Sequence, residues 1–172
     1  FKAHDFVIET IASLPEDYRN KIRLTIGGKG AYKATLEKMV AEKGLCDIVT
    51  FAGFISDEEL RDFYSEHDVF VLCTREDKVN NHVEGFGLVF AEAQACGTPC
   101  IGTRAGGIPD AIDEGNGGWL IEQDSKEQLT SLLKRLVENK EEVEKQSACA
   151  ISRIQASCTW NNYYANLLNL LS

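Results

Sequence analysis

The sequence predicts a single α/β domain in which helices flank a parallel β-sheet. Short apolar segments rich in Val, Ile and Phe alternate along the chain with longer segments whose apolar residues recur at helical spacing. Such alternation is typical of consecutive β-α units, whose strands lie parallel in one sheet. The chain has 172 residues, about the length of one domain with its own core. We therefore expect one α/β domain, residues 1–139, followed by helices at residues 140–172 that pack on it.

Five short segments are predicted as strands because each is apolar and is bounded by Gly, Asp or Thr. They are residues 23–26, 48–52, 69–72, 100–102 and 118–121. Six segments with apolar residues at helical spacing are predicted as helices. They are residues 6–13, 31–42, 57–65, 88–95, 109–112 and 126–138.

Two of these helices carry a recognisable start signal. Glu59 follows Ser56 at the spacing of a capping box, so we interpret the acidic residues 56–59 as structural. Ser125 precedes the helix at 126–138 in the same way. From residue 140 the pattern is helical and charged, and residues 160–171 form an apolar helix face. We expect that face to be mobile or to self-associate when nothing covers it.

Charge and hydropathy exclude several classes of protein. Lys and Arg total 18 and Asp and Glu 27, a formal net charge of −9 that disfavours binding along a nucleic-acid backbone. A small anionic ligand is still compatible with that charge, because helix N-termini and a few placed cations can hold phosphate. No apolar run approaches the ~18 to 20 residues of a membrane span. The N-terminus has no signal-peptide pattern and begins with Phe, so we expect a cytoplasmic fragment of a longer chain.

The six cysteines are scattered and form no CxxC pair. We expect reduced thiols and no metal site, since metal ligands usually recur at short, fixed spacings.

The segment from Glu84 to Asp110, EGFGLVFAEAQACGTPCIGTRAGGIPD, carries the most chemical information. Gly85 and Gly87 stand where a helix begins, which leaves N–H groups at residues 86–88 free to hold an anion. A plain turn into a helix is the alternative interpretation. Glu84 and Glu92 flank this start, and carboxylates accept hydrogen bonds from hydroxyls. We expect the Glu92 carboxylate, in apolar surroundings, to point back toward the amides. A ligand with phosphates and hydroxyls, such as a sugar nucleotide, fits this set.

Glu84 and Glu92 with the following ACGTPCIGTRAGGIPD resemble the retaining GT-B glycosyltransferases of the large family that contains the phosphatidylinositol mannosyltransferases and bacterial sugar transferases. Three further segments agree in order and spacing: LTIGGKG, VTFAGFI and DVFVLC. The resemblance extends over residues 2–138. It implies a Rossmann-like sheet and the C-terminal, donor-binding half of such an enzyme, with residues 140–172 also contacting a missing N-terminal acceptor domain.

The resemblance also implies roles for particular residues. Glu84 would be the catalytic glutamate that contacts the hydroxyls of the donor sugar, and Glu92 would hold the ribose hydroxyls. The backbone amides of Phe86, Gly87 and Leu88 would meet the sugar and the diphosphate. Lys2 would bind the diphosphate, and Phe54 and Ile55 would border the base.

The sequence departs from the family at the diphosphate site. The family has an Arg and then a Lys-Gly pair, whereas here Ala3 follows Lys2 and the Arg would precede Phe1. We therefore expect weakened phosphate binding. The family histidine of the acceptor domain has no counterpart among His4, His67 and His82.

Other polar clusters have structural interpretations. Gly27–Gly30 resembles a phosphate-binding loop, but no Ser or Thr follows Lys29, so a turn at the end of a strand is favoured. Arg75, Asp77 and Lys78 are interpreted as a solvated loop, and His82 as either a ligand contact or an exposed loop residue.

We expect the donor-binding domain of an enzyme that transfers a sugar from a nucleoside-diphosphate sugar to a glycan, lipid or similar acceptor. It needs no cofactor or metal, since cations and helix amides take that role. The intact enzyme would be free in the cytoplasm or peripherally bound at the inner membrane face. Two alternatives are a non-catalytic nucleotide-binding or assembly module, and an epimerase or phosphorylase of similar architecture.

Overall fold

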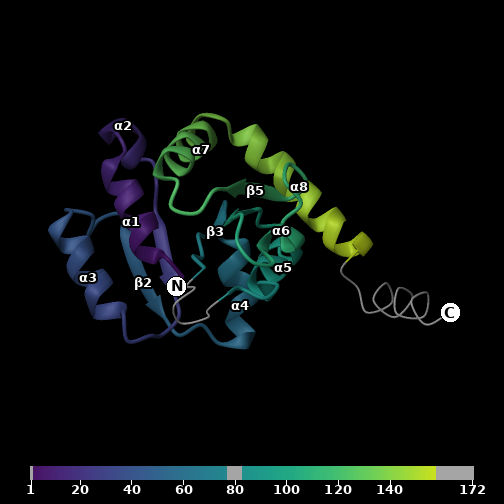
Figure 1. The fold of residues 1–172 in the computed structure, drawn as a ribbon, viewed down its shortest axis with the longest axis horizontal. Helices are drawn as coiled ribbons and strands as arrows, with labels where there is room; N and C mark the ends of the chain where they lie inside the picture. Colours follow the sequence, from purple (N-terminus) through teal and green to yellow (C-terminus); the bar gives the residue numbers. More distant parts are fainter. Residues whose placement is uncertain (1, 77–82, 158–172) are drawn as a thin grey trace.

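The computed structural model describes residues 2–76 and 83–157, and it confirms the α/β fold class with parallel strands (Figure 1). Five strands were found: β1 (Leu24–Gly27), β2 (Val49–Gly53), β3 (Phe70–Leu72), β4 (Cys100–Thr103) and β5 (Gly118–Ile121). They form a two-stranded sheet, β1-β2, and a three-stranded sheet, β3-β4-β5. Every pairing is parallel, with Leu24 opposite Val49 in the first sheet and Cys100 opposite both Phe70 and Gly118 in the second.

Helices connect and cover these strands. They are α1 (His4–Ser13), α2 (Glu16–Arg19), α3 (Lys33–Glu42), α4 (Asp57–Ser65), α5 (Leu88–Ala95), α6 (Ile108–Ala111), α7 (Lys126–Glu138) and α8 (Lys140–Ser157). None of the helices in residues 2–76 and 83–157 is both long and apolar enough to cross a membrane.

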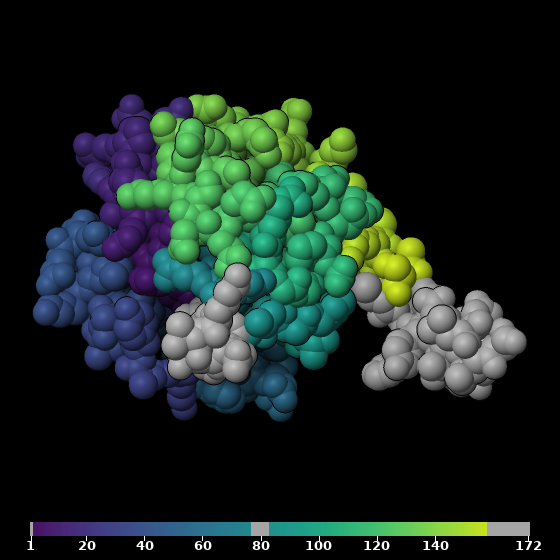
Figure 2. Space-filling view, in the orientation of Figure 1, coloured from purple at the N-terminus to yellow at the C-terminus, as the bar shows by residue number. Residues whose placement is uncertain are grey.

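The helices form a layer on each side of the strands, and each layer has its own core. The first core joins α1, α3 and α7 to the strands through apolar side chains that include Ile8, Leu36, Leu129 and Ile101. The second joins α4, α5 and α6 around Phe90, which is fully buried. Helix α8 packs against α5. In Figure 2 the green atoms of the α7 region lie between the purple N-terminal segment and the yellow-green start of α8.

The order in which the chain adds neighbouring strands reverses between β1 and β3, because the helices that connect the strands before and after this point lie on opposite faces. From β1 it moves to β2 through α3, which packs in the first core. From β3 it moves to β4 and β5 through α5 and α6, which pack in the second core. In open α/β sheets, ligands bind outside the carboxyl ends of the strands at such a reversal. The fold therefore directs attention to the loops that follow β1 and β3.

Candidate functional site

The start of α1 and the segment before α5 meet at this reversal. Lys2, one residue before the α1 cap, places its Nζ 2.6 Å from Oε2 of Glu84. The Glu84 side chain is 15% exposed and that of Lys2 is 42% exposed. The structure thus brings together the cation and the first carboxylate that the sequence assigns to the site, although 82 residues separate them.

Two glycines after β4 hold the Glu84 segment in place. Gly107 donates its backbone N–H to the carbonyl oxygen of Glu84 at 3.0 Å. A Cβ on Gly106 would overlap that same carbonyl oxygen, and one on Gly107 would overlap the carbonyl oxygen of Gly85. Only glycine allows the two backbones to approach this closely. The Gly-Gly pair after β4 was the sequence signal for this contact, but its structural role was not predicted from the sequence.

Helix α5 begins at Gly87, beside Glu84. Gly87 is in the left-handed region, with φ 74° and ψ 60°, and a Cβ there would lie 2.6 Å from the Phe90 ring. The first N–H groups of an α-helix have no partner within the helix, and they carry the positive end of its dipole. The exposed side chains of Phe86 (41%) and Leu88 (68%) border this helix start. The amides of residues 86–88 therefore adjoin the Lys2–Glu84 pair, where an anion can be held.

Glu92 lies on the second turn of α5, and its environment differs from the predicted one. The side chain is exposed and shares a face with Leu88 and Ala95, which follow the i, i+4, i+7 spacing of one helical stripe. The expectation of apolar surroundings is wrong, because Glu92 is exposed while the buried apolar side chains of α5, Phe90 and Ala93, lie on its other face. Its described partner is the hydroxyl of Tyr64 on α4, 3.3 Å from Oε2. No local sequence signal marked Tyr64, which lies 28 residues away.

The loops after β1 and β2 form a second part of the site. Strand β1 ends at Gly27 and the chain bends at Gly28, which has φ 107° and donates its N–H to the carbonyl oxygen of Gly53 at 2.5 Å, so residues 28–30 lie at the end of a strand as predicted. Phe54 is 65% exposed, and the Lys29 ammonium lies 5.0 Å from the centre of its ring. Ile55 is half-buried near Gly27. Both residues predicted to border a base thus lie at the carboxyl end of β2.

A cavity of about 320 Å³ opens beside this loop. It is lined by the start of α1, the turn after β1 and the start of α3, and its lining includes Lys2, Lys29 and Lys33. The three lysines outnumber the one acidic residue of the lining, Asp5, although Lys2 pairs with Glu84 and Lys33 with Glu37. His4 also lines it, and burial lowers the pKa of the His4 imidazole. The cavity therefore favours an anionic group.

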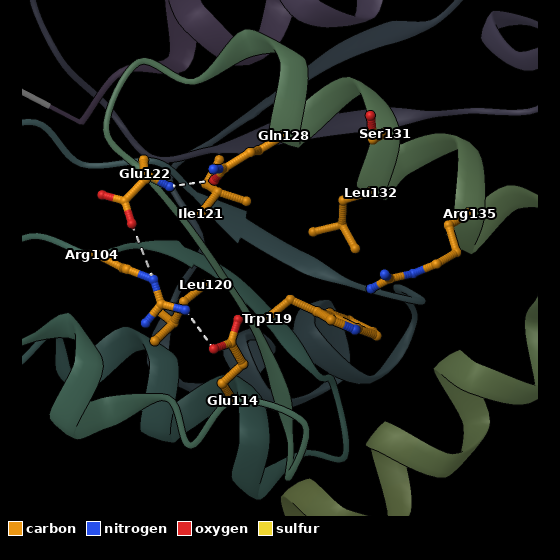
Figure 3. A pocket seen from close by; sticks show the side chains of 10 residues that line it. All are labelled: Arg104, Glu114, Trp119, Leu120, Ile121, Glu122, Gln128, Ser131, Leu132 and Arg135. Carbon is orange, nitrogen blue, oxygen red and sulfur yellow. Dashed lines mark hydrogen bonds and ion pairs between the residues drawn. The ribbon is translucent and has the colours of Figure 1, made fainter.

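A larger cavity of about 550 Å³ lies elsewhere, between β5 and α7 (Figure 3). Its charged groups already have partners: Arg104 contacts Glu114 at 2.5 Å and Glu122 at 3.3 Å, and Arg135 contacts Glu142, which lies outside the lining, at 3.2 Å. The Glu122 amide also donates to Gln128 Oε1 at 2.7 Å. None of the residues predicted for the site lines this cavity. We therefore place the site at the carboxyl ends of β1 and β3 and not in the larger cavity.

Of the remaining polar candidates, Arg75 is not simply solvated as predicted, because it pairs with Asp5 and Asp124. Asp77, Lys78 and His82 lie outside the described residues. Across residues 2–76 and 83–157, no three His, Cys, Asp or Glu side chains are placed to share a metal ion.

The fold is an α/β domain with helices on both sides of parallel strands, and a cavity with three lysines in its lining lies at the reversal of strand order. The chain belongs to the family described as glycosyl transferases group 1, whose model matches residues 1–153. It is 27% identical over 170 residues to the GDP-mannose-dependent α-(1-6)-phosphatidylinositol monomannoside mannosyltransferase of Mycobacterium tuberculosis, covering 99% of this chain and 44% of that relative. The chain thus spans less than half the length of this relative.

Solved structures of glycosyltransferases share the fold, which is therefore of the GT-B type. The HepE protein of Anabaena, solved with UDP, superposes with a TM-score of 0.79 at 20% identity, over 98% of this chain and 45% of that one. The C-terminal domain of the group 1 protein LpcC from Francisella tularensis superposes with a TM-score of 0.76 at 26% identity, over 92% of this chain and 80% of that one.

Proposed function

We propose that this chain is the donor-binding domain of a glycosyltransferase that moves a sugar from a nucleoside-diphosphate sugar to an acceptor such as a glycan or lipid. The observation that carries the proposal is the convergence of Lys2, Glu84 and the start of α5 at the reversal of strand order. Membership of the group 1 family supports it, as does the UDP bound by HepE, which has the same fold.

Each group then has a part in the reaction. Negative charge grows on the diphosphate as the glycosidic bond breaks, and Lys2 and the α5 amides stabilise that charge through fixed electrostatics. Glu84 contacts the sugar hydroxyls, and Glu92 contacts the ribose hydroxyls. Phe54 and Ile55 border the base. Before the donor binds, the Lys2–Glu84 pair keeps both charges neutralised, so the diphosphate must compete with Glu84 for Lys2.

Further parts of the proposal concern the whole protein. The reaction retains the configuration of the donor sugar and uses no cofactor or metal ion. An N-terminal acceptor-binding domain closes over the donor, and residues 140–172 contact it. The enzyme acts in the cytoplasm, free or peripherally at the inner face of the membrane. These statements follow from the family resemblance, and the shortness of the chain relative to its relatives supports the missing domain.

Calorimetric titration with UDP, GDP, ADP and their sugar conjugates tests the proposal. One nucleotide should bind with a dissociation constant of about 0.1 to 1 mM, because a single domain holds the donor from one side only. Lys2→Ala should weaken that binding about 5- to 20-fold, as expected for a charged contact to phosphate. Lys38→Ala, which breaks the exposed Lys38–Glu42 pair on α3, is the matched control and should change nothing. Absence of saturable binding by any of the nucleotides would contradict the proposal.

A further inference from the structure

Tyr64 combines a buried ring with a hydroxyl that reaches the functional face. The residue is 6% exposed, and its ring meets that of Phe70 on β3 edge to face, with 5.5 Å between centroids and an interplanar angle of 84°. The hydroxyl donates to Oε2 of Glu92 at 3.3 Å. A buried tyrosine ring of this kind has few orientations open to it, so its hydroxyl is a fixed donor.

The backbone beneath Tyr64 is also fixed. Thr98, in the loop that follows α5, donates its hydroxyl to the carbonyl oxygen of Tyr64 at 2.7 Å, and Thr98 is 1% exposed. Helix α5 and the loop that follows it are therefore joined to the end of α4 at two points, the helix through Glu92 and the loop through Thr98. The packing of Tyr64 and Thr98 in the core therefore fixes where the Tyr64 hydroxyl lies relative to the backbone of Glu92.

This arrangement restricts the side-chain conformations of Glu92. An exposed glutamate samples many rotamers, and binding a ligand through both carboxylate oxygens freezes them at an entropic cost. A hydrogen bond from Tyr64 to Oε2 removes part of that freedom in advance. It occupies one of about four acceptor sites of the carboxylate, so the others can accept two hydroxyls from a ligand.

We propose that Tyr64 is a positioning residue that orients Glu92 to accept the two adjacent hydroxyls of the donor ribose. This inference rests on the proposed function, since it needs a nucleotide at the site. Tyr64 touches no ligand itself. It acts through Glu92. Removal of the Tyr64 hydroxyl therefore weakens the binding of ligands that carry the ribose hydroxyls and does not change the binding of ligands that lack them.

The test is a comparison of two ligands on the same chain. Binding of the preferred nucleoside diphosphate and of its 2′,3′-dideoxy analogue is measured by calorimetry for the wild type, Tyr64→Phe, Glu92→Ala and the double variant. For Tyr64→Phe, the dissociation constant of the ribose ligand should rise about 3- to 10-fold, the effect of losing one hydrogen bond, while that of the dideoxy ligand stays constant. The double variant should bind no more weakly than Glu92→Ala alone, because coupled groups are not additive.

The chain contains a matched control in Tyr18, whose hydroxyl donates to Glu138 between α2 and α7. Tyr18→Phe should leave both ligands unaffected. If Tyr64→Phe weakens the binding of both ligands equally, the role of Tyr64 is merely structural and the proposal is overturned. An unchanged affinity for the ribose ligand would also overturn it. If the wild type binds no nucleoside diphosphate, or binds the dideoxy analogue equally well, the failure lies in the proposed function or in the role given to Glu92, and the positioning role falls with it.

Discussion

Ala3 holds a backbone conformation that residues other than glycine rarely adopt. It caps α1 with φ 52° and ψ 36° and is 4% exposed, at the position where the resembling family has glycine. The left-handed conformation costs an L-residue about 1 to 2 kcal/mol. Relative to glycine, the buried methyl group of alanine and the lower entropy of the unfolded chain stabilise the fold by roughly 1 to 2 kcal/mol, which offsets this cost. Alanine in place of the family's glycine therefore still allows the left-handed backbone conformation that positions Lys2.

This balance gives a prediction for two substitutions of Ala3. Ala3→Gly should change the free energy of unfolding by less than about 0.5 kcal/mol, because strain and methyl burial cancel. Ala3→Val should lower it by about 2 to 4 kcal/mol, since a β-branched residue is poorly tolerated at positive φ and the site is packed. Urea denaturation of the three proteins measures both values. Equal stability of the valine and glycine variants would contradict the φ assigned to this cap.

At the scale of elements, Arg75 ties the end of β3 to two other segments. Its guanidinium contacts Asp5 on α1 at 3.0 Å and Asp124, before α7, at 2.5 Å. Burial of the Asp5 carboxyl opposes its ionisation, but the hydrogen bond and charge of Arg75 prevail and hold the pKa of Asp5 below its ordinary value of 3.8. A lowered folded-state pKa stabilises the fold above the unfolded-state pKa, and this contribution is lost as the pH falls through the folded value.

We therefore predict a pH-dependent effect of Arg75→Met. At pH 7 the substitution should lower the free energy of unfolding by about 1 kcal/mol, a small value because the charged groups are partly exposed and screened. As the pH falls from 3.8 toward the lowered pKa of Asp5 in the folded wild type, the difference between the two proteins should shrink, because the carboxyl group then becomes protonated in the wild type as well. Denaturation curves at pH 7 and pH 3 measure this, and a difference that is equal at both pH values would refute the role of the carboxyl group.

Elements with strong local signals were predicted most closely. Helices α4, α5 and α7 begin and end where the sequence placed them, and the capping bonds of Ser56–Glu59 and Ser125 are present. The one-turn helix α2 was missed, since four residues are too few to show a helical period. Strand ends moved by one residue because pairing with a neighbour, and not the local sequence, decides where a strand stops.

The site was predicted less completely than the fold for a related reason. Glu84 and Glu92 belong to one contiguous motif and were predicted from it, whereas Lys2 was predicted from the family resemblance. Tyr64 and the Gly106–Gly107 pair act through contacts between distant segments, which no single stretch of sequence reveals. The apolar surroundings expected for Glu92 were wrong because the sequence of a helix alone does not say which of its faces the neighbouring elements leave exposed.

At the scale of the whole molecule, the strands are divided although their core is shared. Within the described residues β1 pairs only with β2 and β3 only with β4, so each has an edge with no strand beside it. Apolar side chains of both, including Ile26 and Val71, pack in the same first core. Helix α1 packs on this core ahead of β1, and a helix in that place normally follows a strand parallel and adjacent to the next one. We expect a strand that precedes Phe1 in the intact protein to join the two sheets.

Thr74, beyond the carboxyl end of β3, gives a further prediction about the core that the strands share. Its hydroxyl is buried and has no hydrogen-bond partner in the described structure, whereas that of Thr103 on β4 donates to the Thr74 carbonyl oxygen at 2.6 Å. Replacing an unpaired buried hydroxyl by a methyl group is stabilising, and replacing a paired one is not. Thr74→Val should therefore raise the free energy of unfolding of this chain by about 1 kcal/mol, and Thr103→Val should lower it by about 1 to 2 kcal/mol, as urea denaturation of the two variants can measure.

In a longer chain that includes the added strand, the amides of β1 and β3 should exchange more slowly with solvent than in this chain. Unchanged exchange at both strands in the longer chain would show that no strand joins the sheets.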